Sequence, residues 1–198
     1  MLLPNMTHDE ILNEIVKDLK EVNTHYGKHY KTCFKRQILQ STSFPFVPSP
    51  LHFTSSRKNK YLIYVEAKKR GDWKPRAYYC VCEVGNMAYM CDDKLSSLYV
   101  FIPHFFSRYR QRFIKDSEIT TQQVIEKYFR RNLIISCKVR GSDNTFIGTC
   151  NDGIVFGTYK NDFAVIKTFI SRDMQFENQK TLCDNLDKCR EDLWKRIA

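Results

Sequence analysis

The stretch Leu98-Tyr-Val-Phe-Ile-Pro-His-Phe-Phe-Ser-Arg-Tyr-Arg-Gln-Arg-Phe113 decides the fold, because an extended apolar run gives way there to a basic helix. Pro103 suits the first turn of a helix, where its fixed φ fits and its missing N–H is not needed. From this start, His104, Arg108 and Arg112 recur at steps of four residues and stay near one helix face. The aromatic residues of the same stretch can pack on the other side: Phe105, Phe106, Tyr109 and Phe113.

A titratable imidazole and two permanent cations on one face are suited to phosphate-ester chemistry. The imidazole of His104 transfers protons near neutral pH. The guanidinium groups of Arg108 and Arg112 bind phosphate oxygens and stabilise charge in a transition state. The alternative is a solvated basic face with a structural histidine, and this segment alone does not decide between the two.

The residues before this stretch predict a helix, a loop and a β-meander. Thr7-His-Asp-Glu10 has the form of a capping box and precedes apolar residues at helical spacing, so we expect a helix over about residues 7–22. Residues 41–56 contain three prolines among Ser and Thr, which indicates a loop and a candidate domain boundary. Apolar alternation then predicts strands, separated by turns at 70–75 and 85–86, over residues 60–66, 76–83, 87–91 and 98–102.

The residues after the basic helix predict a second helix and a small sheet. Thr120 and Gln123 offer a capping box for a helix at about 121–131. Extended runs follow, joined by turns at 141–144, 151–153 and 160–162, over residues 133–139, 145–150, 153–159 and 163–170. An amphipathic pattern predicts a last helix at about 176–197.

These elements predict an α+β fold, in which helices pack on a small antiparallel β-sheet and an N-terminal helix and a β-meander precede it. We expect an N-terminal segment, 1–56, that holds the first helix and the loop. A single α+β domain, 57–198, follows. Its parts are the meander 57–102, the basic helix with its sheet 103–171, and the C-terminal helix 176–197.

Charge points to polyanionic partners. The chain has 198 residues, a formal net charge of +10 and a pI of about 9.2. The excess is densest over residues 104–140, with nine Lys/Arg against three Asp/Glu. A basic patch around the candidate helix favours nucleic acid or an acidic protein surface.

The sequence gives little support for a metal site, a membrane segment or a cofactor site. The eight cysteines form no CxxC pair, so we expect no metal site and interpret them as small core residues of a cytoplasmic protein. We also expect no signal peptide and no membrane span. There is no P-loop, no dinucleotide-binding glycine pattern and no HExxH motif, so no cofactor is expected.

The last predicted strand, Val165-Ile-Lys-Thr-Phe-Ile-Ser171, is expected to complete the site. Strict alternation places Lys167 with Phe169 on one face, and Thr168 with Ile166 and Ile170 on the other. Lys167 could add charge stabilisation, while Thr168 and Ser171 could hydrogen-bond a phosphate or orient the base. The alternatives are that Lys167 is an exposed strand residue and Thr168 a strand former.

Two residues of the helix are candidate substrate contacts. Tyr109 and Arg110 could stack on a base or contact the nucleic-acid backbone. For Tyr109 we favour a core role.

The order Pro-His-x-x-x-Arg-x-x-x-Arg, a short helix, and a sheet ending in Val-Ile-Lys-Thr-Phe-Ile resembles the barnase–EndoU–colicin–RelE-like superfamily of small metal-independent ribonucleases and toxins. The resemblance covers residues 101–171. It implies catalytic roles for His104, Arg108, Arg112 and Thr168, with Lys167 and Ser171 as further candidates.

The leading hypothesis is a metal-independent endoribonuclease that acts on RNA as a toxin of a toxin–antitoxin or mobile-element system, with a neutralising or acidic protein partner. The first alternative is a non-catalytic module that binds nucleic acid or an acidic protein on a ribonuclease-like fold. The second is an interaction protein that uses the aromatic residues of the meander, such as Trp73, Tyr79 and Tyr89.

Overall fold

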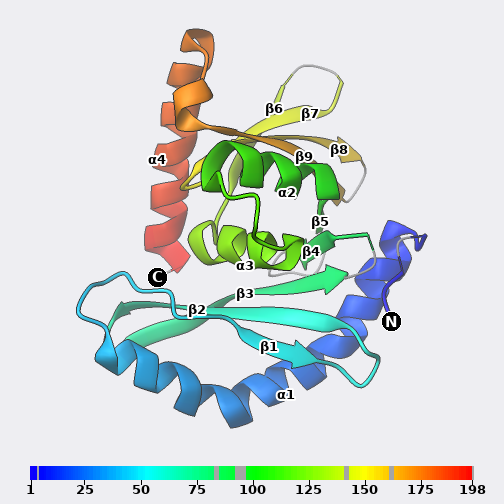
Figure 1. Ribbon diagram of the computed structural model, residues 1–198, viewed down its shortest axis with the longest axis vertical. Coiled ribbons are helices and arrows are strands. Elements are labelled where there is room, and N and C mark those ends of the chain that lie inside the picture. Colours follow the sequence, from blue (N-terminus) through cyan, green and yellow to red (C-terminus); the bar gives the residue numbers. More distant parts are fainter. Residues whose placement is uncertain (4, 83–84, 92–96, 141–142, 161–162, 198) are drawn as a thin grey trace. The chain divides into compact units, whose positions relative to one another are not determined.

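The computed structural model describes residues 1–3, 5–82, 85–91, 97–140, 143–160 and 163–197, and it shows the expected α+β fold with antiparallel strands (Figure 1). The chain forms two compact units, an N-terminal unit of residues Met1–Leu98 and a C-terminal unit of residues Tyr99–Ala198. The proline-containing segment 41–56 lies inside the first of them.

The N-terminal unit begins with the long helix α1, His8–Gln40. Its start is the predicted capping box, because Thr7 Oγ1 accepts from the Glu10 N–H at 3.3 Å while the Glu10 carboxylate accepts from the Thr7 N–H at 2.7 Å. The predicted end near residue 22 was wrong. The apolar stripe continues to the buried Phe34 and Ile38, and the helix ends only where Ser41 becomes extended.

The strands of this unit pair antiparallel in chain order: β1 (Leu51–Thr54), β2 (Lys60–Lys69), β3 (Asp72–Cys82) and β4 (Met87–Cys91). Strand β1 lies in the segment that was predicted as a loop, and β3 begins within the predicted turn. Pro75 is accommodated in β3 beside a register shift, where the ladder is interrupted. Gly85 and Asn86 form the predicted turn with φ of 88° and 52°.

A buried carboxylate on α1 ties the helix to the segment that leads into β2. Asp18 is fully buried and accepts hydrogen bonds from Ser55 Oγ at 2.8 Å, Asn59 Nδ2 at 2.7 Å and Tyr61 Oη at 2.9 Å. Arg57 Nη1 donates to its other oxygen at 3.1 Å. Burial raises the pKa of Asp18, but the hydrogen bonds together outweigh it and leave the pKa below its ordinary value.

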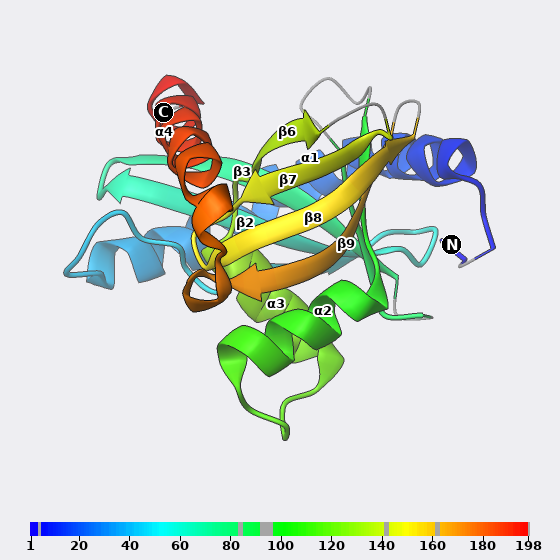
Figure 2. The same ribbon diagram turned by 90° about the horizontal axis from the view of Figure 1, so that it is seen from above.

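The C-terminal unit is a sheet with helices on both faces (Figure 2). Its strands lie in the order β5 (Leu98–Phe101, of which Tyr99–Phe101 belong to this unit), β9 (Phe163–Ser171), β8 (Gly153–Lys160), β7 (Thr145–Thr149) and β6 (Ser136–Arg140). The β6–β7–β8–β9 pairs are antiparallel, as predicted. The predicted turns at 141–144 and 160–162 lie partly outside the described residues.

An aromatic core fills one face of this sheet. The basic helix forms as predicted, as α2 (Pro103–Tyr109) followed by a π-helical turn, η1 (Arg110–Ile114). Helix α3 (Thr121–Arg131) begins at the predicted capping box. Edge-on ring contacts join α2 to α3, at 4.9 Å between Phe105 and Tyr128, and α2 to β9, at 5.0 Å between Tyr109 and Phe169.

Helix α4, Lys180–Ile197, covers the other face of the sheet (Figure 2). Its Cys183 and Leu186 pack with Ile147 of β7 and Ile154 of β8. Cys150 and Cys183 are buried, as the core interpretation of the cysteines predicted, whereas Cys33 and Cys189 are exposed. Within the described residues, no helix has the length and apolar character needed to cross a membrane.

Candidate functional site

The predicted His/Arg face is present on α2 and η1, and we use this name for His104, Arg108 and Arg112. The imidazole of His104 is exposed, and its Nε2 accepts a hydrogen bond from Arg108 Nε at 3.3 Å. Arg108 Nη1 also donates to Gln111 Oε1 at 2.9 Å. The first step of four residues therefore brings the imidazole and the guanidinium into direct contact, as the helical spacing predicted.

Acidic side chains of the described residues do not neutralise the two arginines of the His/Arg face. In the part of the chain that the structure describes, neither Arg108 nor Arg112 forms an ion pair with a carboxylate. The pKa of Arg112 is lowered by burial and by the positive charge of Arg108 nearby. Two adjacent cations that repel each other favour the binding of an anion between them.

The π-helical turn and β9 together fix the position of Arg112. Lys115 ends the turn in a left-handed conformation, with φ of 57°, and its N–H donates to Arg110 O at 2.8 Å. Arg112 Nη1 donates to the backbone carbonyl of Phe169 at 2.5 Å. This bond holds the half-buried Arg112 against the sheet and leaves its remaining donors for a ligand.

Thr168 does not join this constellation. Its neighbour Phe169 packs against α2, and Thr168 pairs with Phe156, which lies with Ile170 against the α4 cluster. Since side chains alternate along a strand, Thr168 faces α4 rather than the His/Arg face. The geometry therefore separates Thr168 from the catalytic role implied by the resemblance.

A β-bulge in β9 explains why strict alternation of side chains predicted the wrong face for part of this strand. Ile166 pairs with Gly157 and Thr168 with Phe156, so Lys167 is the extra residue of the bulge. Ile166 and Thr168 consequently lie opposite consecutive residues of β8 and face opposite sides, which corrects the prediction that they share a face. Lys167 is exposed, in agreement with both of its interpretations.

The remaining candidate contacts differ in accessibility. Tyr109 is fully buried and donates to Asp152 Oδ2 at 2.6 Å, so it has the favoured core role and its ring is not accessible to a substrate. Ser171 is 5% exposed at the end of β9, which leaves little of its hydroxyl to a substrate. Arg110 is half-buried and lies about 200° around the helix from Arg108, away from the His/Arg face.

A polar cluster centred on Asp152 in the β7–β8 turn was not predicted from the sequence. The buried carboxylate accepts from Tyr109, from Arg131 Nε and Nη2 at 2.9 and 2.8 Å, and from Asn132 Nδ2 at 2.8 Å. The Asp152 N–H in turn donates to Asn132 Oδ1 at 3.0 Å. The turn motif Asn151-Asp-Gly153 concealed this role, because Asp at a turn needs no tertiary partner to explain it.

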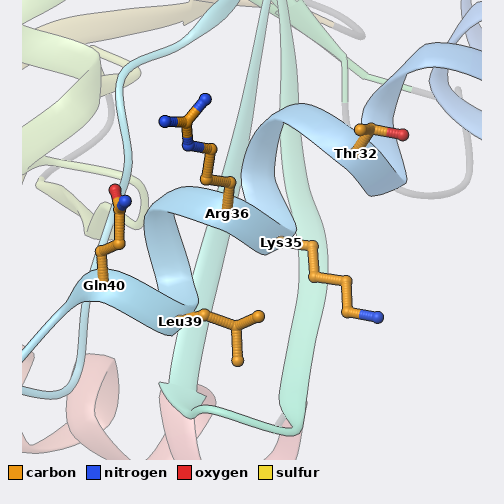
Figure 3. A pocket seen from close by; sticks show the side chains of 5 residues that line it. All are labelled: Thr32, Lys35, Arg36, Leu39 and Gln40. Atoms are coloured by element: carbon orange, nitrogen blue, oxygen red, sulfur yellow. The ribbon is translucent and has the colours of Figure 1, made fainter.

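A shallow open pocket lies on α1 in the N-terminal unit, lined by the exposed side chains of Thr32, Lys35, Arg36, Leu39 and Gln40 (Figure 3). It occupies about 620 Å³. The residues recur at helical spacing on one side of α1, and two of them are cationic. They include no carboxylate or imidazole for proton transfer.

Comparison with known protein families, with curated proteins and with solved structures finds no match to the chain. Among the described residues, no group of three or more His, Cys, Asp or Glu side chains is placed to hold a metal ion. The interpretation of the His/Arg face therefore depends on its geometry alone. The face offers guanidinium donors for a phosphate group, and the imidazole of His104 is in contact with Arg108.

Proposed function

We propose that the protein binds RNA and that its C-terminal unit contacts the phosphate backbone through the His/Arg face. The observation that carries this proposal is the pair of adjacent guanidinium groups, Arg108 and Arg112, without a carboxylate partner in the described part of the chain. Bound phosphate would relieve their mutual repulsion. The dense positive charge of residues 104–140 adds long-range attraction for the same ligand.

Salt-dependent binding of a labelled single-stranded RNA tests this proposal. Each phosphate contact contributes about 0.7 to the slope of log affinity against log salt for a single strand. The double variant Arg108→Ala/Arg112→Ala should lower that slope by about 1.4 and weaken binding at all salt concentrations.

The matched control removes the same charge from exposed positions of β6, as Lys138→Ala/Arg140→Ala. It should change the affinity much less and leave the slope nearly unchanged. Equal effects of the two double variants would show that binding follows net charge alone, and the proposed site would be wrong.

Metal-independent RNA cleavage is the second candidate function, and the contact between His104 Nε2 and Arg108 Nε supports it. An imidazole beside a phosphate-binding cation can accept the proton of a ribose 2′-hydroxyl. Binding has the stronger support, because Thr168 faces away from the His/Arg face and, among the described residues, His104 is the one predicted proton-transfer group left there. A toxin role in a toxin–antitoxin or mobile-element system would require this cleavage.

An RNA-cleavage assay in EDTA, with wild type and His104→Ala, separates the two candidates. Cleavage that persists in the chelator and disappears in the variant would establish a ribonuclease centred on His104. RNA binding without cleavage by either protein would support the non-catalytic binding function and exclude cleavage of the RNA tested.

A further inference from the structure

Two exposed apolar side chains follow β9 in the C-terminal unit. Phe176 is 68% exposed and Met174 is 43% exposed. They belong to a short segment that contains the turns η2 (Arg172–Met174) and η3 (Glu177–Gln179) and joins β9 to α4. Within the described residues, the ring of Phe176 makes no aromatic contact, in contrast to the packed rings of α2 and α3.

This segment lies beside the His/Arg face. Arg112 is bonded to the carbonyl of Phe169, and Phe176 follows only seven residues later, a separation of at most about 25 Å. The pKa of Asp173 is lowered by hydrogen bonding, mainly from Ser171, and to a smaller extent by the charge of Lys115 at the end of η1. Figures 1 and 2 both show the segment after β9 next to the end of α2 that continues into η1.

An exposed ring beside phosphate-binding cations is the combination that binds single-stranded nucleic acids. The cations follow the backbone, and the ring provides a surface on which an unpaired base stacks. A duplex keeps its bases in the helical stack, so it can use the cations but not the ring. A site with such a ring therefore favours single-stranded over double-stranded nucleic acid.

We propose that Phe176 stacks on an unpaired base of the strand whose phosphates lie on Arg108 and Arg112, so that the protein selects single-stranded over double-stranded RNA. This inference rests on the proposed RNA-binding function. The inference adds to that function a residue outside the basic helix, Phe176, that determines specificity.

Fluorescence anisotropy with three 12-nucleotide probes tests the proposal: a single-stranded RNA, the same sequence as DNA, and the RNA annealed to its complement. Phe176→Ala should weaken binding of the single-stranded RNA by roughly 5- to 150-fold, the range expected for loss of one stacked base. Binding of the duplex should not change. Phe176→Trp should keep the affinity for the single strand and show fluorescence quenching that wild type lacks.

The control Val139→Ala removes another exposed apolar side chain, 48% exposed on β6, and should leave all affinities unchanged. Single-strand affinity that is the same in Phe176→Ala as in this control would overturn the inference. An equal loss for single strand and duplex would overturn it too, because the ring would then not select unpaired bases.

The experiment separates failure of the inference from failure of the proposed function. If Arg108→Ala/Arg112→Ala weakens binding and Phe176→Ala does not, the site binds phosphate and the stacking proposal alone is wrong. If the double variant binds all probes as wild type does, the proposed function itself fails, and the inference fails with it. Equal loss for single-stranded RNA and DNA in Phe176→Ala would support stacking, which requires no 2′-hydroxyl.

Discussion

Arginines in the C-terminal unit occur in two opposite settings. Arg131 donates to the buried carboxylate of Asp152 and lies over the ring of Phe113, with its guanidinium carbon 5.1 Å from the ring centroid. Hydrogen bonding to Asp152 is the main reason that the pKa of Arg131 is raised. Arg108 and Arg112 instead lie beside each other without a carboxylate among the described residues, and the pKa of Arg112 is lowered.

This difference in carboxylate partners shows which arginines are available to bind a ligand. Arg131 compensates a charge that burial would otherwise make costly, so its energy contributes to the fold. Among the described residues, no carboxylate pairs with the arginines of the His/Arg face, and a bound anion would supply that partner. Counting positive charges over residues 104–140 does not distinguish these roles.

The largest expected effect comes from Asp152→Ala. It leaves Arg131, Tyr109 and Asn132 without their common acceptor. The Tyr109 hydroxyl and the Asn132 amide are buried, and a buried donor that loses its acceptor costs about 1–3 kcal/mol, so the free energy of unfolding should fall by roughly 3–5 kcal/mol. Arg131, which is 56% exposed, adds little because water can solvate it. Chemical denaturation should show this loss, whereas the exposed control Asp184→Ala should stay within about 0.5 kcal/mol of wild type. A small effect of Asp152→Ala would remove the contrast between the two arginine settings.

Substitution of Asp18 tests whether a buried carboxylate in the N-terminal unit also stabilises the fold through its hydrogen bonds. Asp18→Asn should lower the free energy of unfolding by about 2 kcal/mol at pH 7, because hydrogen bonds to the charged group are weakened. The folded-state pKa of Asp18 is below its ordinary value of 3.8, so its stabilising effect is present above that value and lost as the pH falls through the folded-state pKa.

Unfolding free energies measured from pH 7 down to pH 2 should therefore fall more steeply below about pH 4 for wild type than for Asp18→Asn. Parallel curves would show that the carboxylate contributes no pH-dependent stability.

A smaller effect is expected for Tyr109→Phe, which removes one hydrogen bond from Asp152 and leaves Arg131 and Asn132 in place. The cost should be about 1 kcal/mol at pH 7. Burial is the main cause that raises the pKa of Tyr109 above its ordinary value of 10.0, so the neutral phenol stabilises the fold below pH 10 and this stabilisation is lost as the pH rises further. Between pH 8 and pH 11 the stability of wild type should fall more than that of Tyr109→Phe.

The smallest effect on stability is expected for Arg108→Ala. The side chain bonds only to His104 and Gln111 in the described structure, and its removal relieves repulsion on Arg112. The free energy of unfolding should stay within about 0.5 kcal/mol of wild type. Arg131→Ala, measured in parallel, should destabilise the protein clearly more, and similar values for the two variants would contradict the comparison.

Periodicity and capping residues were sufficient to predict most elements. Helix α3 has its predicted ends, and α2 begins at Pro103 as expected, because these signals depend only on neighbours in the chain. The predicted boundaries were wrong where contacts between distant residues decide the structure. Helix α1 continues past residue 22 and buries Phe34 and Ile38, and β1 is a strand that pairs with β2.

The sequence by itself determined the α+β class, the two capping boxes and the contact between His104 and Arg108, since residues four apart on a helix are neighbours in any tertiary context. Only the tertiary structure decided the rest of the site. The bulge at Lys167 separates Ile166 and Thr168 onto opposite faces, the carbonyl of Phe169 holds Arg112, and Asp152 takes Tyr109 into the core. The bulge depends on strand register, and the other two contacts join groups tens of residues apart; local spacing encodes neither.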